Sequence, residues 1–118
     1  MDNIYIEGNK GIPEIHFKNN GKLSISGRSY PDDANLIYNP LLEFVASLEV
    51  NDVVFDVNLD YLNSGSIKYI KRIIHEIEDN KNIKTATVKW HFEDDDEKNK
   101  ELGFMFKEIS TKCKFEFK

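Results

Sequence analysis

The chain has 118 residues, of which 40% are hydrophobic and 31% charged, and its formal net charge at pH 7 is −5. This length suits a single domain with its own core, and the acidic balance argues against nucleic acid or an anionic membrane as a main partner. No apolar run approaches the roughly 18 residues of a membrane span, and Met1-Asp2-Asn3 does not open a signal peptide, so we expect a cytoplasmic protein without membrane insertion.

The first part of the chain predicts a β-hairpin. Apolar and polar residues alternate over residues 3–7 and 14–18. The alternation resumes at residues 23–26 after Asn19-Asn20-Gly21, whose residue types tolerate the positive φ angles of tight turns. The three runs together predict a hairpin, with an extra edge strand as an option, and residues 27–31 then break the pattern.

A first helix is predicted over residues 34–48, where apolar residues recur at helical spacing. Asp32 or Asp33 can cap it, and Leu36 belongs to its inward face. Pro40 lies inside the pattern and removes a backbone hydrogen bond, so a kink or a late helix start is expected there.

The rest of the chain alternates between the two patterns. Strands are predicted at residues 53–60 and 85–92 and at the end of the chain, where Cys113, Phe115 and Phe117 alternate with charged residues. Helices are predicted at residues 67–79 and 96–109. The inward face of the later helix is expected to consist of Leu102, Met105, Phe106 and Ile109.

Strands that alternate with helices require parallel crossover connections. We therefore predict an α/β fold in which residues 1–118 form a single domain. It has a mixed sheet with an N-terminal β-hairpin and about three helices packed mainly on one face. No internal repeat, low-complexity segment or linker divides the chain.

No residue pattern indicates an enzyme, a metal or a cofactor. The three histidines, His16, His75 and His91, have no Cys or His at metal-ligand spacing, and the single cysteine, Cys113, excludes an internal disulfide. The chain also lacks a nucleophile elbow, a phosphate-binding loop and a dinucleotide fingerprint. The acidic run at residues 93–97 lacks the spacing and glycine of a calcium loop and is typical of a solvated helix start, although it could also serve as a docking patch.

A polar turn between the strand at 53–60 and the helix at 67–79 contains Asn63, Ser64, Gly65 and Ser66. A hydroxyl group here lies at a helix N-terminus, where backbone N–H groups and the helix dipole favour negative charge. The residues alone leave two interpretations open. Ser64 is either a helix cap without a further role or a phosphorylation site.

Exposed aromatic residues flank this turn in the sequence. Tyr61 and Leu62 precede it, and Tyr30 ends the hairpin. If these residues cluster around Ser64, they form a contact surface rimmed by Arg28 and Lys68 that a protein partner could use.

Five segments resemble, in order and spacing, those of the SiaC-type regulatory phosphoproteins, small bacterial proteins of biofilm and second-messenger signalling. The resemblance covers nearly the whole chain, and the combination is more specific than any one segment. The segments are Ile4-Tyr5-Ile6-Glu7-Gly8 with Pro13-Glu14-Ile15, Ile25-Ser26-Gly27-Arg28-Ser29-Tyr30-Pro31, Tyr38-Asn39-Pro40-Leu41-Leu42-Glu43, Leu59-Asp60-Tyr61-Leu62-Asn63-Ser64, and Val88-Lys89-Trp90-His91-Phe92-Glu93-Asp94-Asp95-Asp96.

The resemblance implies a phosphorylation switch on a fold similar to the STAS domains of anti-sigma-factor antagonists. In this family a kinase with a histidine-kinase-like ATPase fold phosphorylates a hydroxyl residue of the turn, and a PP2C-type phosphatase removes the phosphate. The unphosphorylated form binds and activates a diguanylate cyclase, the enzyme that makes cyclic di-GMP.

The phosphorylated threonine of the family falls by position on Ser64. The family usually reads Asn-Thr-Ser-Ser where this chain has Asn63-Ser64-Gly65-Ser66, so the hydroxyl group is kept and Ser66 becomes a second candidate. The partner-binding residues expected from this turn and its surroundings are Arg28, Tyr30, Tyr61, Leu62, Asn63, Gly65 and Lys68. The alternative function is a constitutive STAS-like scaffold that binds proteins without a phosphoswitch.

Overall fold

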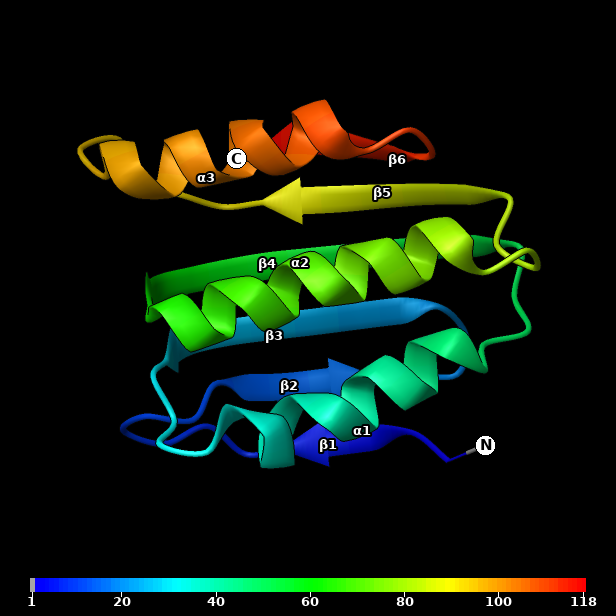
Figure 1. The fold of residues 1–118 in the computed structure, drawn as a ribbon, viewed down its shortest axis with the longest axis horizontal. Helices are drawn as coiled ribbons and strands as arrows, with labels where there is room; N and C mark the ends of the chain where they lie inside the picture. Colours follow the sequence, from blue (N-terminus) through cyan, green and yellow to red (C-terminus); the bar gives the residue numbers. More distant parts are fainter. Residues whose placement is uncertain (1) are drawn as a thin grey trace.

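Six strands form one sheet in which they lie side by side in chain order, as the computed structural model of residues 2–118 shows (Figure 1). β1 pairs with β2 and β2 with β3 in antiparallel fashion, whereas β3, β4, β5 and β6 are parallel. The mixed sheet with its N-terminal hairpin is therefore confirmed. The elements are β1 (Ile4–Ile6), β2 (Glu14–Phe17), β3 (Lys22–Ser29), α1 (Ala34–Ala46), β4 (Asp52–Leu62), α2 (Ser64–Asp79), β5 (Thr85–Trp90), α3 (Glu97–Ile109) and β6 (Cys113–Phe117).

All three helices lie on one face of the sheet, as predicted (Figure 1). This arrangement follows from the strand order, because right-handed crossovers between successive parallel strands put every connecting helix on the same side. Alternate strand residues such as Phe55 and Val57 point into the core beneath the helices and are almost fully buried. No helix within residues 2–118 has the length and apolar character needed to span a membrane.

The predicted break at residues 27–31 is wrong, whereas the extra edge strand is present as β1. β3 lies inside the sheet, between β2 and β4, and continues to Ser29 through the segment that was expected to break it. The glycine of that segment, Gly27, adopts a φ of 100°, and the β3–β4 register shifts between Gly27 and Arg28. A local bulge therefore absorbs the irregularity while the strand continues.

The first helix begins at Ala34 and runs through Pro40 to Ala46, so a late start at the proline is also wrong. Asp33 holds the N-cap position without a side-chain hydrogen bond to the helix. The carbonyl group of Leu36 loses its usual N–H partner at Pro40. Because Leu36 and Pro40 are both exposed, water can take the place of that partner.

Three apolar residues that were assigned to inward helix faces are exposed instead. Leu36 is 68% exposed, Met105 48% and Ile109 46%. Phe106 of the same helix is fully buried, and its ring meets Trp90 of β5 edge to face with 5.6 Å between the ring centroids. The apolar stripe of α3 is therefore wider than the part that the sheet covers.

Candidate functional site

The polar turn predicted between the strand at 53–60 and the helix at 67–79 is shorter than expected. β4 continues to Leu62 and α2 already begins at Ser64, so Asn63 alone connects them. Asn63 has an extended backbone (φ −84°, ψ 171°), and its side-chain Oδ1 accepts a hydrogen bond from the Ser66 N–H at 2.9 Å. Asn63 is therefore the helix cap, and the interpretation of Ser64 as the cap is wrong.

Ser64 is exposed in the first turn of α2. In the part of the chain that the structure describes, its hydroxyl group has no hydrogen-bond partner and carries no capping role. The N–H groups of a first helical turn also lack intrahelical acceptors, so the position favours an added negative charge.

Ser66, only two residues later, lies in the opposite environment. It is fully buried, and its Oγ donates a hydrogen bond to the Ser29 carbonyl oxygen at 3.0 Å. The Ser66 Oγ also lies 2.7 Å from the Ser29 Oγ, which is 2.6 Å from the Tyr38 hydroxyl oxygen. Of the two candidate phosphorylation sites, this burial favours Ser64.

The three buried hydroxyl groups have a fixed hydrogen-bond direction. Each hydroxyl carries one proton, and that of Ser66 is used on the Ser29 carbonyl group. Ser29 must therefore donate to Ser66, and Tyr38 to Ser29. Burial raises the pKa of Tyr38, so its phenol group stays a neutral donor.

This hydroxyl cluster of Ser29, Tyr38 and Ser66 ties the start of α2 to β3 and α1. The Ser29 carbonyl oxygen also accepts the N–H of Asn63 at 3.0 Å, so the connecting residue is held at the same point. The cluster therefore fixes the position from which Ser64 projects.

Most of the predicted partner-binding residues lie together at the carboxyl ends of β3 and β4. Arg28 pairs with Tyr61 in the strand register and Ser29 with Leu62. The rings of Tyr30 and Tyr61 meet edge to face, with 5.6 Å between their centroids, and Tyr61 is 48% exposed. The two aromatic residues therefore lie together close to Asn63 in the chain, and their role in binding a partner stays a prediction.

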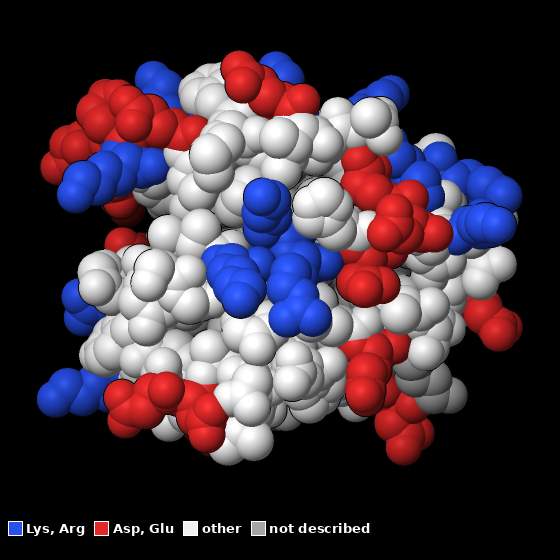
Figure 2. Space-filling view, viewed as in Figure 1, with Lys and Arg blue, Asp and Glu red and all other residues white. Residues whose placement is uncertain are grey.

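The other two predicted contact residues belong to α2. Lys68 is exposed one helical turn after Ser64. A Cβ atom at Gly65 would lie 3.8 Å from the Asn63 Oδ1 and 3.9 Å from the Ala34 Cβ, which is ordinary contact, so the fold does not require glycine at this position. Figure 2 shows basic side chains gathered over the middle of the helix face, where Lys68, Lys71 and Arg72 of α2 are exposed.

Two shallow hollows border the contact surface. One, of about 380 Å³, lies between the starts of α2 and α3 and is lined by Tyr61, Leu62 and Ile67, among others. The second, of about 400 Å³, includes Tyr30 and the exposed Leu36. Sequence reasoning missed Leu36 as a surface residue because its helical spacing assigned it to the core.

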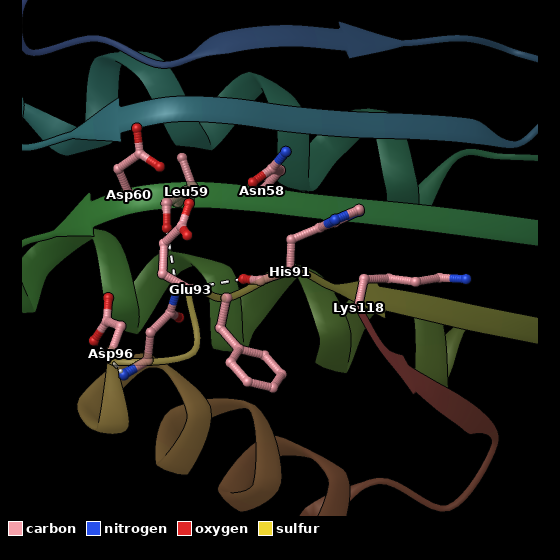
Figure 3. Close-up of a pocket in the computed structure, with 9 residues that line it drawn as sticks. Asn58, Leu59, Asp60, His91, Glu93, Asp96 and Lys118 are labelled. Atoms are coloured by element: carbon pink, nitrogen blue, oxygen red, sulfur yellow. Dashed lines mark hydrogen bonds between the residues drawn. The ribbon is translucent and has the colours of Figure 1, made fainter.

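A third hollow, of about 230 Å³, lies at the carboxyl ends of β4 and β5 (Figure 3). The side-chain nitrogen of Asn99 bridges the two strands by donating to the carbonyl oxygens of Leu59 at 3.2 Å and His91 at 3.3 Å. The Nε2 of His91 lies 2.9 Å from an oxygen of Asp56. Among residues 2–118 no three His, Cys, Asp or Glu side chains are placed to hold a metal ion.

The acidic run before α3 begins the helix, as predicted. Asp96 is the N-cap, and its side chain accepts the N–H of Asn99 at 3.1 Å. Glu93, Asp94 and Asp95 are exposed.

Comparison with known proteins gives consistent results over the whole chain. A family model described as SiaC family regulatory phosphoprotein matches residues 6–118. A protein of Pseudomonas aeruginosa strain UCBPP-PA14 is 27% identical over 122 residues, which cover 99% of this chain and 94% of the relative.

Solved structures agree with this family match. The crystal structure of apo-SiaC from Pseudomonas aeruginosa is 26% identical with a TM-score of 0.83, and the match covers 100% of this chain and 99% of that one. A similar chain occurs in the crystal structure of the diguanylate cyclase SiaD in complex with its activator SiaC from the same organism. It is 25% identical with a TM-score of 0.81, and the match covers 98% of this chain and 99% of that one.

Proposed function

Because the chain belongs to the SiaC family of regulatory phosphoproteins, we propose that it is a phosphorylation switch for a diguanylate cyclase. Unphosphorylated, it binds and activates the cyclase through the surface around Tyr30 and Tyr61. Phosphorylation of Ser64 ends this contact. The protein carries out no reaction itself and acts in the cytoplasm.

The observation that carries this proposal is the contrast between the two serines of the turn. Ser64 presents an exposed hydroxyl group next to the contact surface, whereas Ser66 is buried in the hydroxyl cluster. The enzymes that phosphorylate and dephosphorylate Ser64 are those that the family resemblance implies. They are a kinase with a histidine-kinase-like ATPase fold and a PP2C-type phosphatase.

Phosphorylation can stop binding without disturbing the fold. A phosphate adds about −1.5 to −2 charge at neutral pH, and the first turn of a helix tolerates this charge. Ser64 points to solvent, so the phosphate displaces no packed atom. In a complex, however, the same charge would lie within the interface and would have to lose its water, which raises the free energy of the bound state.

The proposal predicts where phosphate is found on the protein in its native host. Intact mass spectrometry of the purified protein should show a fraction that carries one phosphate, and fragment spectra should place it on Ser64. The Ser64→Ala variant, expressed in the same host, should lose this fraction completely. Phosphate that persists on Ser64→Ala, or is mapped to Ser66, would contradict the assignment.

The same measurement separates the switch from a constitutive STAS-like scaffold. A scaffold needs no modification, and Ser64 would then be an ordinary surface residue of α2. Protein without phosphate in every growth condition, including cells that lack PP2C-type phosphatases, would favour the scaffold.

A further inference from the structure

β6 is the last strand of the sheet, and within residues 2–118 it pairs only with β5. The N–H of Lys118 donates to the Trp90 carbonyl oxygen at 3.0 Å, so this residue faces β5. Since hydrogen-bonding direction alternates along a strand, Phe115 and Phe117 direct their backbone N–H and C=O groups away from the sheet. Such a row of unpaired backbone groups is a template for a further strand.

The N-terminal end of this edge is partly closed. The N–H of Cys113 is taken by a carboxylate oxygen of Glu78 at 3.1 Å. The backbone groups that remain unpaired along this edge are the Cys113 carbonyl group and the N–H and C=O groups of Phe115 and Phe117. Phe115 is the middle residue of this set.

Aromatic side chains extend along the helix side of the same edge. Phe115 and Phe117 are only half-buried, and their ring centroids are 6.1 Å apart. Phe104 of α3, 41% exposed, stacks on Phe117 with 4.4 Å between centroids. An added strand would therefore cover apolar surface as well as complete hydrogen bonds.

The opposite side of the strand has alternating charges. Lys114 and Glu116 are both exposed there, and Lys118 follows. When two identical strands pair antiparallel about an axis at Phe115, Lys114 lies opposite Glu116 of the other strand at both ends. These residues fall in the closely spaced positions without mutual backbone hydrogen bonds, where side chains approach each other most closely.

We propose that β6 pairs antiparallel with β6 of a second copy of this chain, about a two-fold axis at Phe115. The two six-stranded sheets are then joined end to end, and the Phe115 side chains of both copies meet on the helix side. The contact lies at the β6 edge and does not involve Ser64, so this inference goes beyond the proposed switch and does not depend on it.

The charges disfavour two of the neighbouring registers. An axis at Glu116 would put Glu116 opposite itself and Lys114 opposite Lys118, and an axis at Lys114 would put that lysine opposite itself. Like charges directly opposite each other destabilise a strand pair. Moving the axis to Phe117 would pair Glu116 with Lys118 and would separate Lys114 from Glu116, so the effect of substituting Lys114 distinguishes these two registers.

Sedimentation equilibrium of the purified full chain over a wide concentration range tests the proposal. The wild-type protein should show a reversible monomer–dimer equilibrium. Lys114→Glu and Glu116→Lys each turn both attractive pairs into repulsive ones, so each variant should raise the dissociation constant by about tenfold or more. Lys10→Glu, in the loop between β1 and β2 near the other edge of the sheet, makes the same charge change and should leave the constant unaltered.

Mixing the two variants provides the sharpest test. Lys114→Glu presents two acidic residues and Glu116→Lys two basic ones, so a mixture should form heterodimers with near wild-type affinity, and the double variant should recover self-association. A monomeric wild-type protein at every concentration would overturn the proposal. So would a dimer that is insensitive to Lys114→Glu, or a mixture that fails to restore association.

Discussion

Ser66→Asp should lower the free energy of unfolding by about 3 kcal/mol or more, because it places a carboxylate without a compensating cation inside a buried hydroxyl cluster. The Ser66 side chain is fully buried, and both of its hydrogen-bond partners belong to Ser29. Urea denaturation can be followed by the fluorescence of Trp90, the only tryptophan and a fully buried one.

Ser64→Asp is the matched control for this change. The same substitution two residues earlier should alter the free energy of unfolding by only about 0.5 kcal/mol, because the side chain is exposed and the helix N-terminus favours negative charge. A Ser66→Asp protein as stable as Ser64→Asp would show that the hydroxyl cluster admits a charge, and Ser66 would become as suitable a phosphorylation site as Ser64.

Tyr61→Ala should weaken binding to the cognate diguanylate cyclase by about tenfold to hundredfold, since a partly exposed aromatic side chain at the centre of a contact surface supplies much of its binding energy. Tyr61 is 48% exposed and its ring meets that of Tyr30 edge to face, so about half of the side chain is accessible to a partner. Isothermal titration calorimetry with the purified cyclase measures this effect directly.

Tyr5→Ala provides the matched control for the tyrosine substitution. Tyr5 is 61% exposed on β1 and has a similar edge-to-face contact, with 4.5 Å to the ring of His16. Tyr5 lies on the edge strand β1, separated from β4 by β2 and β3, so the Tyr5→Ala variant should bind the cyclase as the wild type does. Equal binding by Tyr61→Ala and Tyr5→Ala would remove the carboxyl ends of β3 and β4 from the interface.

Local patterns predicted the order of the elements well, because alternation and helical spacing report which side of each element is buried. They could not assign partners to strands. Leu23 and Ile25 show the same alternation whether β3 lies at an edge or inside the sheet, and only its parallel pairing with β4 decides this. The exposure of Met105 and Ile109 likewise depends on the position and rotation of α3 on the sheet. The spacing of apolar residues within the helix does not reveal either.

The candidate site illustrates the same limit at the level of single residues. Asn63, Ser64 and Ser66 can each cap a helix, and the choice depends on how far β4 continues before α2 begins. The hydroxyl cluster joins Ser29 to Ser66 across 37 positions of the sequence, and no local pattern indicates such a contact. The resemblance to the family placed Ser64 by position, and the fold explains why this hydroxyl group is the accessible one.

The most direct test of the switch compares the binding of the cognate diguanylate cyclase to unmodified protein, Ser64-phosphorylated protein, Ser64→Ala and Ser64→Asp. Ser47→Asp, an exposed serine just after α1, serves as the charge control. We predict that unmodified protein, Ser64→Ala and Ser47→Asp bind and activate the cyclase equally, and that phosphorylated protein and Ser64→Asp bind at least about tenfold more weakly. Equal binding by the phosphorylated and unmodified proteins would contradict the account.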